Sequence, residues 1–180
     1  MVRTAAILEL AFLCIAPGAR AEDAGSAFDF FHRLCLSVGP DFERTIAVAK
    51  VRGWSPLSTG VLTGLAPVDN PEAIEGWVVS DNGSPLPMIV GVSKHSVNGT
   101  LVHTCTVVAH GIDSMAFERS FFQTTDMEAF DQVRSPTHIH KIYRSILNDR
   151  RAFVTLTVPA EPDGTDNLIA SSIAEAKLEN

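Results

Sequence analysis

The chain lacks an apolar run long enough to cross a membrane. A bilayer requires about 20 consecutive apolar residues, and the stretch Ala5–Ala16 is roughly a dozen residues long and contains Glu9. We therefore expect no transmembrane anchor. Arg3 precedes this run, and a small-residue segment ending at Ala21 follows it. Charged start, apolar centre and small-residue end are typical of a secretory signal peptide.

These features predict two parts of the chain. Residues 1–21 form a signal peptide cleaved after Ala21, and residues 22–180 form a single α+β domain that is exported to the periplasm or the extracellular space. The alternative is that the first segment stays attached as an amphipathic helix.

Basic residues are scarce. Without Arg3, Arg20 and Glu9, the mature chain has 12 Lys and Arg against 20 Asp and Glu, a formal net charge of −8. An acidic surface repels phosphate backbones and anionic lipids. We therefore expect no nucleic-acid partner, and no membrane insertion after the signal peptide is cleaved.

Cysteines are also few. The mature chain has two, Cys35 and Cys105, and neither belongs to a Cys-x-x-Cys motif or a zinc-binding pattern. In an oxidising compartment such a pair most often forms one disulfide. In the chain-entropy model a bridge at this spacing stabilises the fold by about 4 kcal/mol before strain is subtracted. We predict a structural disulfide between them.

Catalytic signatures are missing too. The sequence has no Gly-x-Ser-x-Gly elbow and no Ser-x-x-Lys pair, and the glycines of Gly60–Gly64 lack the lysine of a phosphate-binding loop. Carboxylate pairs such as Glu72 and Glu75 are better explained as helix caps and solvated loops. No catalytic residue and no cofactor are predicted.

The first half of the mature chain begins with two expected helices, at 26–36 and from Pro40, as the first helical position, to about 52. Asp41 and Glu43 suit the N-terminus of the second helix, and Gly53 suits its C-terminal cap. Residues 55–76 have little periodicity, apart from a very short helix expected from Asn70 to Gly76. This long segment is either a lid or a cover over a sheet edge.

Asn-Gly turns at Asn82 and Asn98 separate three apolar runs, which predict strands at 77–80, 86–94 and 100–109. The remaining elements follow from apolar spacing and turn residues. They are a helix at 111–123, a polar loop at 124–136, a hairpin of 137–147 with 152–158, and a terminal helix that begins at Thr165 or Asp166.

This order predicts an α+β fold of two layers. A five-stranded antiparallel sheet, made of a three-strand meander and a hairpin, packs against N- and C-terminal helices. The layout is similar to that of profilin-like or PAS-like domains, which are mostly binding and sensory modules. A shared layout does not transfer a function.

Two histidines are candidates for metal ligands. On a strand, His138 and His140 point to the same side, about 7 Å apart, which is close enough to share an ion. A third ligand at short spacing is missing, and His95, His103 and His110 could approach only through the fold. Solvated histidines beside a loop are the simpler interpretation, and we predict no metal site.

The same region is locally basic. Arg144, Arg150 and Arg151 belong to a group of cations that also includes Arg134 and Lys141. Such a group can bind a carboxylate, a phosphate or an acidic partner, or it can protect a sheet edge from aggregation.

Together these features favour an exported binding module, which recognises a small anionic ligand or another envelope protein. A small metal-dependent enzyme that uses His138 and His140 is the alternative.

Overall fold

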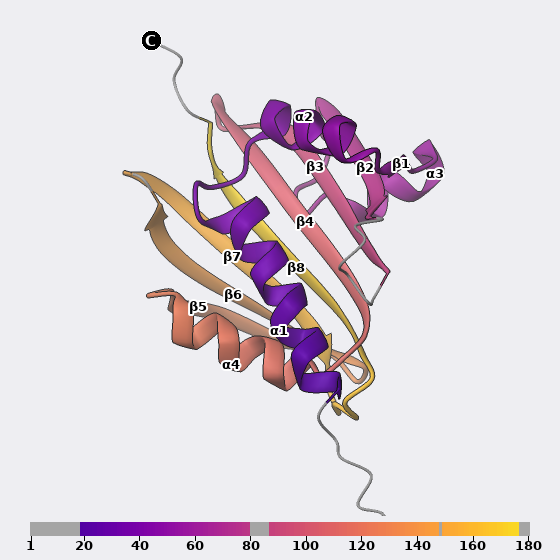
Figure 1. Ribbon diagram of the computed structural model, residues 1–180. Helices are drawn as coiled ribbons and strands as arrows, with labels where there is room; N and C mark the ends of the chain where they lie inside the picture. The colour runs from indigo at the N-terminus through magenta and orange to yellow at the C-terminus, as the bar shows by residue number, and fades with distance from the viewer. Residues whose placement is uncertain (1–18, 80–86, 148, 177–180) are drawn as a thin grey trace, which may run out of the picture.

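The computed structural model describes residues 19–79, 87–147 and 149–176. These residues form one antiparallel sheet with the strand order β1-β2-β3-β4-β8-β7-β6-β5 (Figure 1). The strands are β1 (Ser55–Pro56), β2 (Ala73–Val79), β3 (Met88–Val97), β4 (Thr100–Ile112), β5 (Glu128–Arg134), β6 (His138–Leu147), β7 (Arg150–Pro159) and β8 (Asp166–Glu175). The helical segments are α1 (Ala19–Phe31), a π-helical turn η1 (His32–Leu36), α2 (Phe42–Arg52), α3 (Thr59–Leu62), a 3-10 turn η2 (Thr63–Leu65) and α4 (Ser114–Thr124).

The sheet consists of two four-stranded halves joined along its middle. Strands β1 to β4 form one half in chain order, and β5 to β8 form the other. Strand β4 pairs with β8, with Cys105 opposite Ser172 and Val107 opposite Ala170. Helix α4 lies in the connection between the halves. The last strand, β8, returns to the centre of the sheet, between β4 and β7.

One face of the sheet, which we call the helical face, carries the main core. Helices α1, α2 and α4 lie on it (Figure 1). Phe31, Phe117 and Phe121 are fully buried there, and burying such a side chain contributes about 1.5–3 kcal/mol. A disulfide joins Cys35 in η1 to Cys105 in β4, with a Cα–Cα distance of 5.4 Å.

The other face, which we call the open face, carries the residues that alternate with the core residues, such as Thr106 and Ser171. Leu65 of η2 packs on this face against β2 and β3. A Cβ atom added at Gly91 would lie 2.7 Å from Leu65 Cβ, and one at Gly76 would lie 2.8 Å from a methyl carbon of Leu62. Both positions therefore require glycine for the α3–η2 segment to approach the sheet.

Further along the open face, large apolar side chains remain exposed. Phe130 on β5, Ile146 on β6 and Phe153 on β7 are among them.

The predicted fold class is wrong, because the sheet has eight strands rather than five and does not have a profilin-like or PAS-like layout. The main cause is the C-terminal segment, which was expected to be a helix and is strand β8. Leu168, Ala170 and Ala174 are buried on the helical face, while Ile169 and Ile173 lie on the open face. A central strand with small and apolar residues on both faces does not alternate, so its spacing resembled that of a helix.

Two other segments also form strands where none were expected. The predicted loop at 124–136 contains β5, whose seven residues are all exposed and therefore give no apolar alternation. The short helix expected from Asn70 to Gly76 is not formed, because strand β2 begins at Ala73. Pairing of β1 with the outer side of β2 shows that part of the 55–76 segment covers a sheet edge.

Several local predictions are confirmed. Gly53 ends α2 in the left-handed conformation, as predicted. The helix begins two residues later than expected, at Phe42, and Asp41 is its cap, because the Asp41 side chain accepts a hydrogen bond from the Arg44 backbone N–H. Asn98 and Gly99 both have positive φ in the β3–β4 turn, as the Asn-Gly hairpin signal requires. The turns at Asn82 and Asn148 lie outside the described residues.

Most of the predicted signal peptide, residues 1–18, also lies outside the described residues. Among the helices that the structure describes, none has both the length and the apolar character needed to span a bilayer.

Candidate functional site

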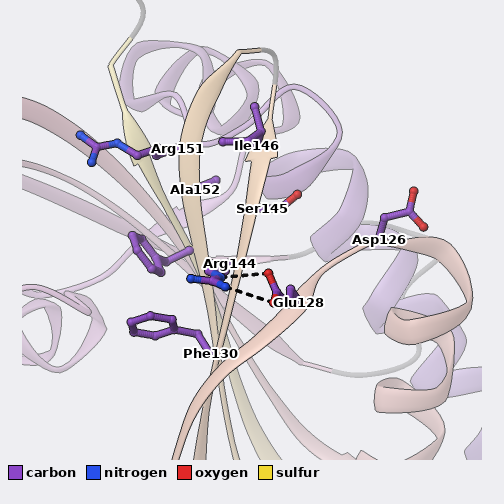
Figure 2. Close-up of a pocket in the computed structure, with 9 residues that line it drawn as sticks. Asp126, Glu128, Phe130, Arg144, Ser145, Ile146, Arg151 and Ala152 are labelled. Atoms are coloured by element: carbon purple, nitrogen blue, oxygen red, sulfur yellow. Dashed lines mark hydrogen bonds and ion pairs between the residues drawn. The ribbon is translucent and has the colours of Figure 1, made fainter.

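A cavity of about 470 Å³ opens at the end of the sheet formed by β5, β6 and β7. Figure 2 shows how side chains from these three strands gather around it. The lining residues are Asp126, Glu128, Phe130, Arg144, Ser145, Ile146, Arg151, Ala152 and Phe153. Its volume and its mixture of aromatic and charged groups are those of small-molecule sites.

The apolar wall of the cavity is an aromatic pair. Phe130 and Phe153 meet edge to face with ring centroids 5.7 Å apart, yet they are 55% and 37% exposed. The β5–β6 register shifts between Ala129 and Asp131, so Phe130 lies in a β-bulge. Bulges redirect side chains at sheet edges, often next to binding sites.

The polar wall is an ion pair between Arg144 and Glu128, which are opposite each other on β6 and β5. The guanidinium donates to both carboxylate oxygens at 3.0 and 3.1 Å, and it lies 5.5 Å from the ring centre of Phe130. These hydrogen bonds lower the pKa of Glu128 and raise that of Arg144, so both groups are charged at neutral pH. The arginine therefore presents a fixed fork of donors beside an aromatic surface.

The three predicted arginines do not lie together. Arg151 is on the open face at the edge of the cavity, where it donates to the Glu175 carboxylate at 2.8 and 3.0 Å. Arg150 points to the helical face and donates to the backbone carbonyls of Val38 and Glu175. The structure therefore brings Arg144 and Arg151 to one cavity and gives Arg150 a position that holds backbone segments together.

The two predicted histidine candidates lie on β6 outside the cavity lining. His138 Nδ1 lies 2.9 Å from the Thr137 hydroxyl, and His140 Nδ1 lies 2.9 Å from the Thr157 hydroxyl. Of the residues the structure describes, the one set of three potential metal ligands found close together does not include them.

A serine and a histidine also meet beneath the α3–η2 segment. Ser93 Oγ lies 2.6 Å from His95 Nε2 and 2.5 Å from the Thr104 hydroxyl. All three residues are buried. A nucleophile must reach its substrate, so this network is best explained as the mutual satisfaction of buried polar groups.

Sequence reasoning missed Glu128, Phe130 and Phe153 as site residues. Phe153 lies in a segment that was predicted only as a strand of the 137–158 hairpin, and β5 was not predicted as a strand. An aromatic residue between acids, Glu128-Ala129-Phe130-Asp131, was the one available signal. It does not indicate a site until the strand pairing is known.

The fold and the cavity define a disulfide-linked protein with a single large antiparallel sheet and a candidate ligand site on its open face. Comparisons of the chain with protein-family models, with curated proteins and with solved structures gave no match.

Proposed function

We propose that this protein is an exported binding module that holds a small amphipathic ligand in the cavity between β5, β6 and β7. The observation that carries the proposal is the placement of an exposed aromatic pair directly beside an arginine fork. Exposed aromatic rings are costly on a surface that has no partner, and guanidinium groups suit carboxylate, sulfate or phosphate.

The ligand would place its apolar body against Phe130 and Phe153 and its anionic group on Arg144. Glu128 now occupies the donors of that arginine, but its side chain is mostly exposed and can turn away into solvent. The anionic group of the ligand would thus replace the Glu128 carboxylate on Arg144, while the apolar body of the ligand covers the two phenylalanine rings.

Export is the second part of the proposal. The order of residues at the N-terminus is that of a signal peptide, and a disulfide links η1 to β4. Disulfides persist mainly in oxidising compartments, which supports a periplasmic or extracellular location.

The fluorescent anion 1-anilinonaphthalene-8-sulfonate tests the binding proposal, because it joins an aromatic body to a sulfonate. We expect saturable binding that becomes weaker as salt rises. Phe130→Ser with Phe153→Ser should weaken binding by about tenfold or more, a loss of about 1.4 kcal/mol for each factor of ten. Val51→Ser, which removes an exposed apolar side chain from α2, is the control and should have no effect.

Glu128→Gln tests whether the sulfonate of the dye binds to Arg144. If the ligand group competes with Glu128 for Arg144, this variant binds the dye more tightly and Arg144→Gln binds it less tightly. Equal binding by the wild type, the double phenylalanine variant and Arg144→Gln would contradict the proposal.

A further inference from the structure

A second group of polar side chains lies on the helical face, and its histidine is on β4, which β8 separates from the cavity strand β7. A carboxylate oxygen of Asp41, a carboxylate oxygen of Glu43 and a ring nitrogen of His103 all lie within 4.8 Å of one another. The two acids come from the start of α2, and His103 comes from β4 beneath it. The fold thus assembles ligands that are 60 residues apart in the sequence.

The imidazole of His103 lacks good hydrogen-bond partners. Its side chain is buried, with 9% of the residue exposed. Nε2 has no partner, and Nδ1 has one long contact of 3.4 Å with the backbone N–H of Phe42. Buried polar groups are nearly always satisfied, and an exception of this kind points to a bound water or ion.

A cation already lies beside the cluster. The Lys94 ammonium pairs with Glu43 and lies 4.8 Å from the ring centre of Phe42. Glu43 therefore already binds a cation in this structure, and Lys94 is a group with which another cation must compete. The Glu43 side chain is 64% exposed, so it can turn from the lysine toward a new ion at little cost.

We propose that Asp41, Glu43 and His103 form a binding site for one divalent transition-metal ion, with Zn²⁺ as the test case. One imidazole with two carboxylates suits borderline ions such as Zn²⁺ better than Ca²⁺, which prefers six to eight oxygen ligands. Zn²⁺ bonds of 2.0–2.1 Å place tetrahedral ligand atoms roughly 3.3 Å apart, so atoms that now lie within 4.8 Å of one another must close by at most about 1.5 Å. Three protein ligands leave a fourth position open to water.

Calorimetric titration of the disulfide-bonded, tag-free protein with Zn²⁺ alone tests this site. We expect one ion per chain. Glu43→Gln and His103→Gln should each weaken binding by about tenfold or more. Lys94→Gln should strengthen it, because the ion no longer displaces an ammonium. Circular dichroism checks that each variant folds. If His103→Gln does not fold, the exposed variant Glu43→Gln provides the test.

Two controls separate this site from other causes. Glu75→Gln removes the same charge from an exposed position on β2 and should leave Zn²⁺ affinity unchanged. The double variant His138→Gln, His140→Gln should also leave it unchanged. The proposal is overturned if the wild type binds no stoichiometric Zn²⁺, even when Lys94→Gln binds it. It is equally overturned if binding survives Glu43→Gln or is lost in the β6 double variant.

Discussion

The helical face and the open face are made by alternate residues of the same strands, yet they differ in what completes them. On the helical face, helices cover aromatic and aliphatic side chains, and Phe117 and Phe121 have no exposed surface. A disulfide ties η1 to the sheet on this face. On the open face at β5–β7, Phe130 and Phe153 stay exposed beside charged groups. Phenylalanine therefore has a structural role on the helical face and is available for binding on the open face.

Matched phenylalanine substitutions should give the largest difference between the faces. Phe117→Ala removes a ring that packs against Phe28 and Phe31, and it should lower the free energy of unfolding by about 3–5 kcal/mol. Phe153→Ala removes a partly exposed ring, and it should cost less than about 1.5 kcal/mol while it weakens dye binding. Urea unfolding measures both, and equal losses of stability would contradict the assignment of the faces.

Removal of the disulfide should have the next largest effect. The double variant Cys35→Ala, Cys105→Ala should lose about 2–4 kcal/mol, since the bridge restrains the unfolded chain. Its dye affinity should stay near that of the wild type as long as it is folded, because the cavity is on the other face. Thiol labelling of the denatured, unreduced wild type should find neither Cys35 nor Cys105 free. Two labelled thiols at these positions would refute the bridge.

Adjacent arginines on β7 sharpen the comparison at a smaller scale. Arg150→Gln leaves the carbonyls of Val38 and Glu175 without their donor, and it should cost about 1–3 kcal/mol. Arg151→Gln breaks an exposed ion pair, and it should change stability by about 0–1 kcal/mol. We expect only the second variant to change the salt dependence of dye binding. The reverse pattern would place the binding role on the helical face.

A pH-dependent effect concerns Tyr143, the single tyrosine of the chain, which neighbours Arg144 on β6 but points to the helical face. Burial, with the nearby Glu118 carboxylate, raises the pKa of Tyr143 from 10 to about 12. The folded state therefore favours the neutral phenol. This contribution to stability is complete below pH 10 and is lost as the pH rises toward 12.

Phenolate absorbance measures this pKa directly. We expect ionisation near pH 12, or earlier only together with the loss of the circular dichroism signal. A midpoint near pH 10 in folded protein would show that Tyr143 is not buried.

The same contrast explains how much of the structure could be predicted from the sequence. The left-handed cap at Gly53, the turn at Asn98 and Gly99, and the first strands depend on local chemistry, and their types were predicted correctly. Strand β8 was missed because both of its faces are apolar or small, and β5 was missed because neither face is buried. Their places in the sheet depend on pairing with distant strands.

The candidate sites were less predictable for the same reason. Arg144 was identified from local charge, but its partners Glu128 and Phe130 become visible only once β5 pairs with β6. Likewise, His103 was left without companions in the sequence, because Asp41 and Glu43 reach it only across the packing of α2 on β4.

Backbone amide NMR during titration with 1-anilinonaphthalene-8-sulfonate tests the central claim most directly. The account predicts saturable shifts of amides around Phe130, Arg144 and Phe153, with the amides of α1 and α2 unchanged. It also predicts that Phe130→Ser with Phe153→Ser abolishes those shifts while the rest of the spectrum keeps its native dispersion. Saturable shifts confined to the helical face, or no saturable shifts at all, would contradict the claim that the open face is the binding surface.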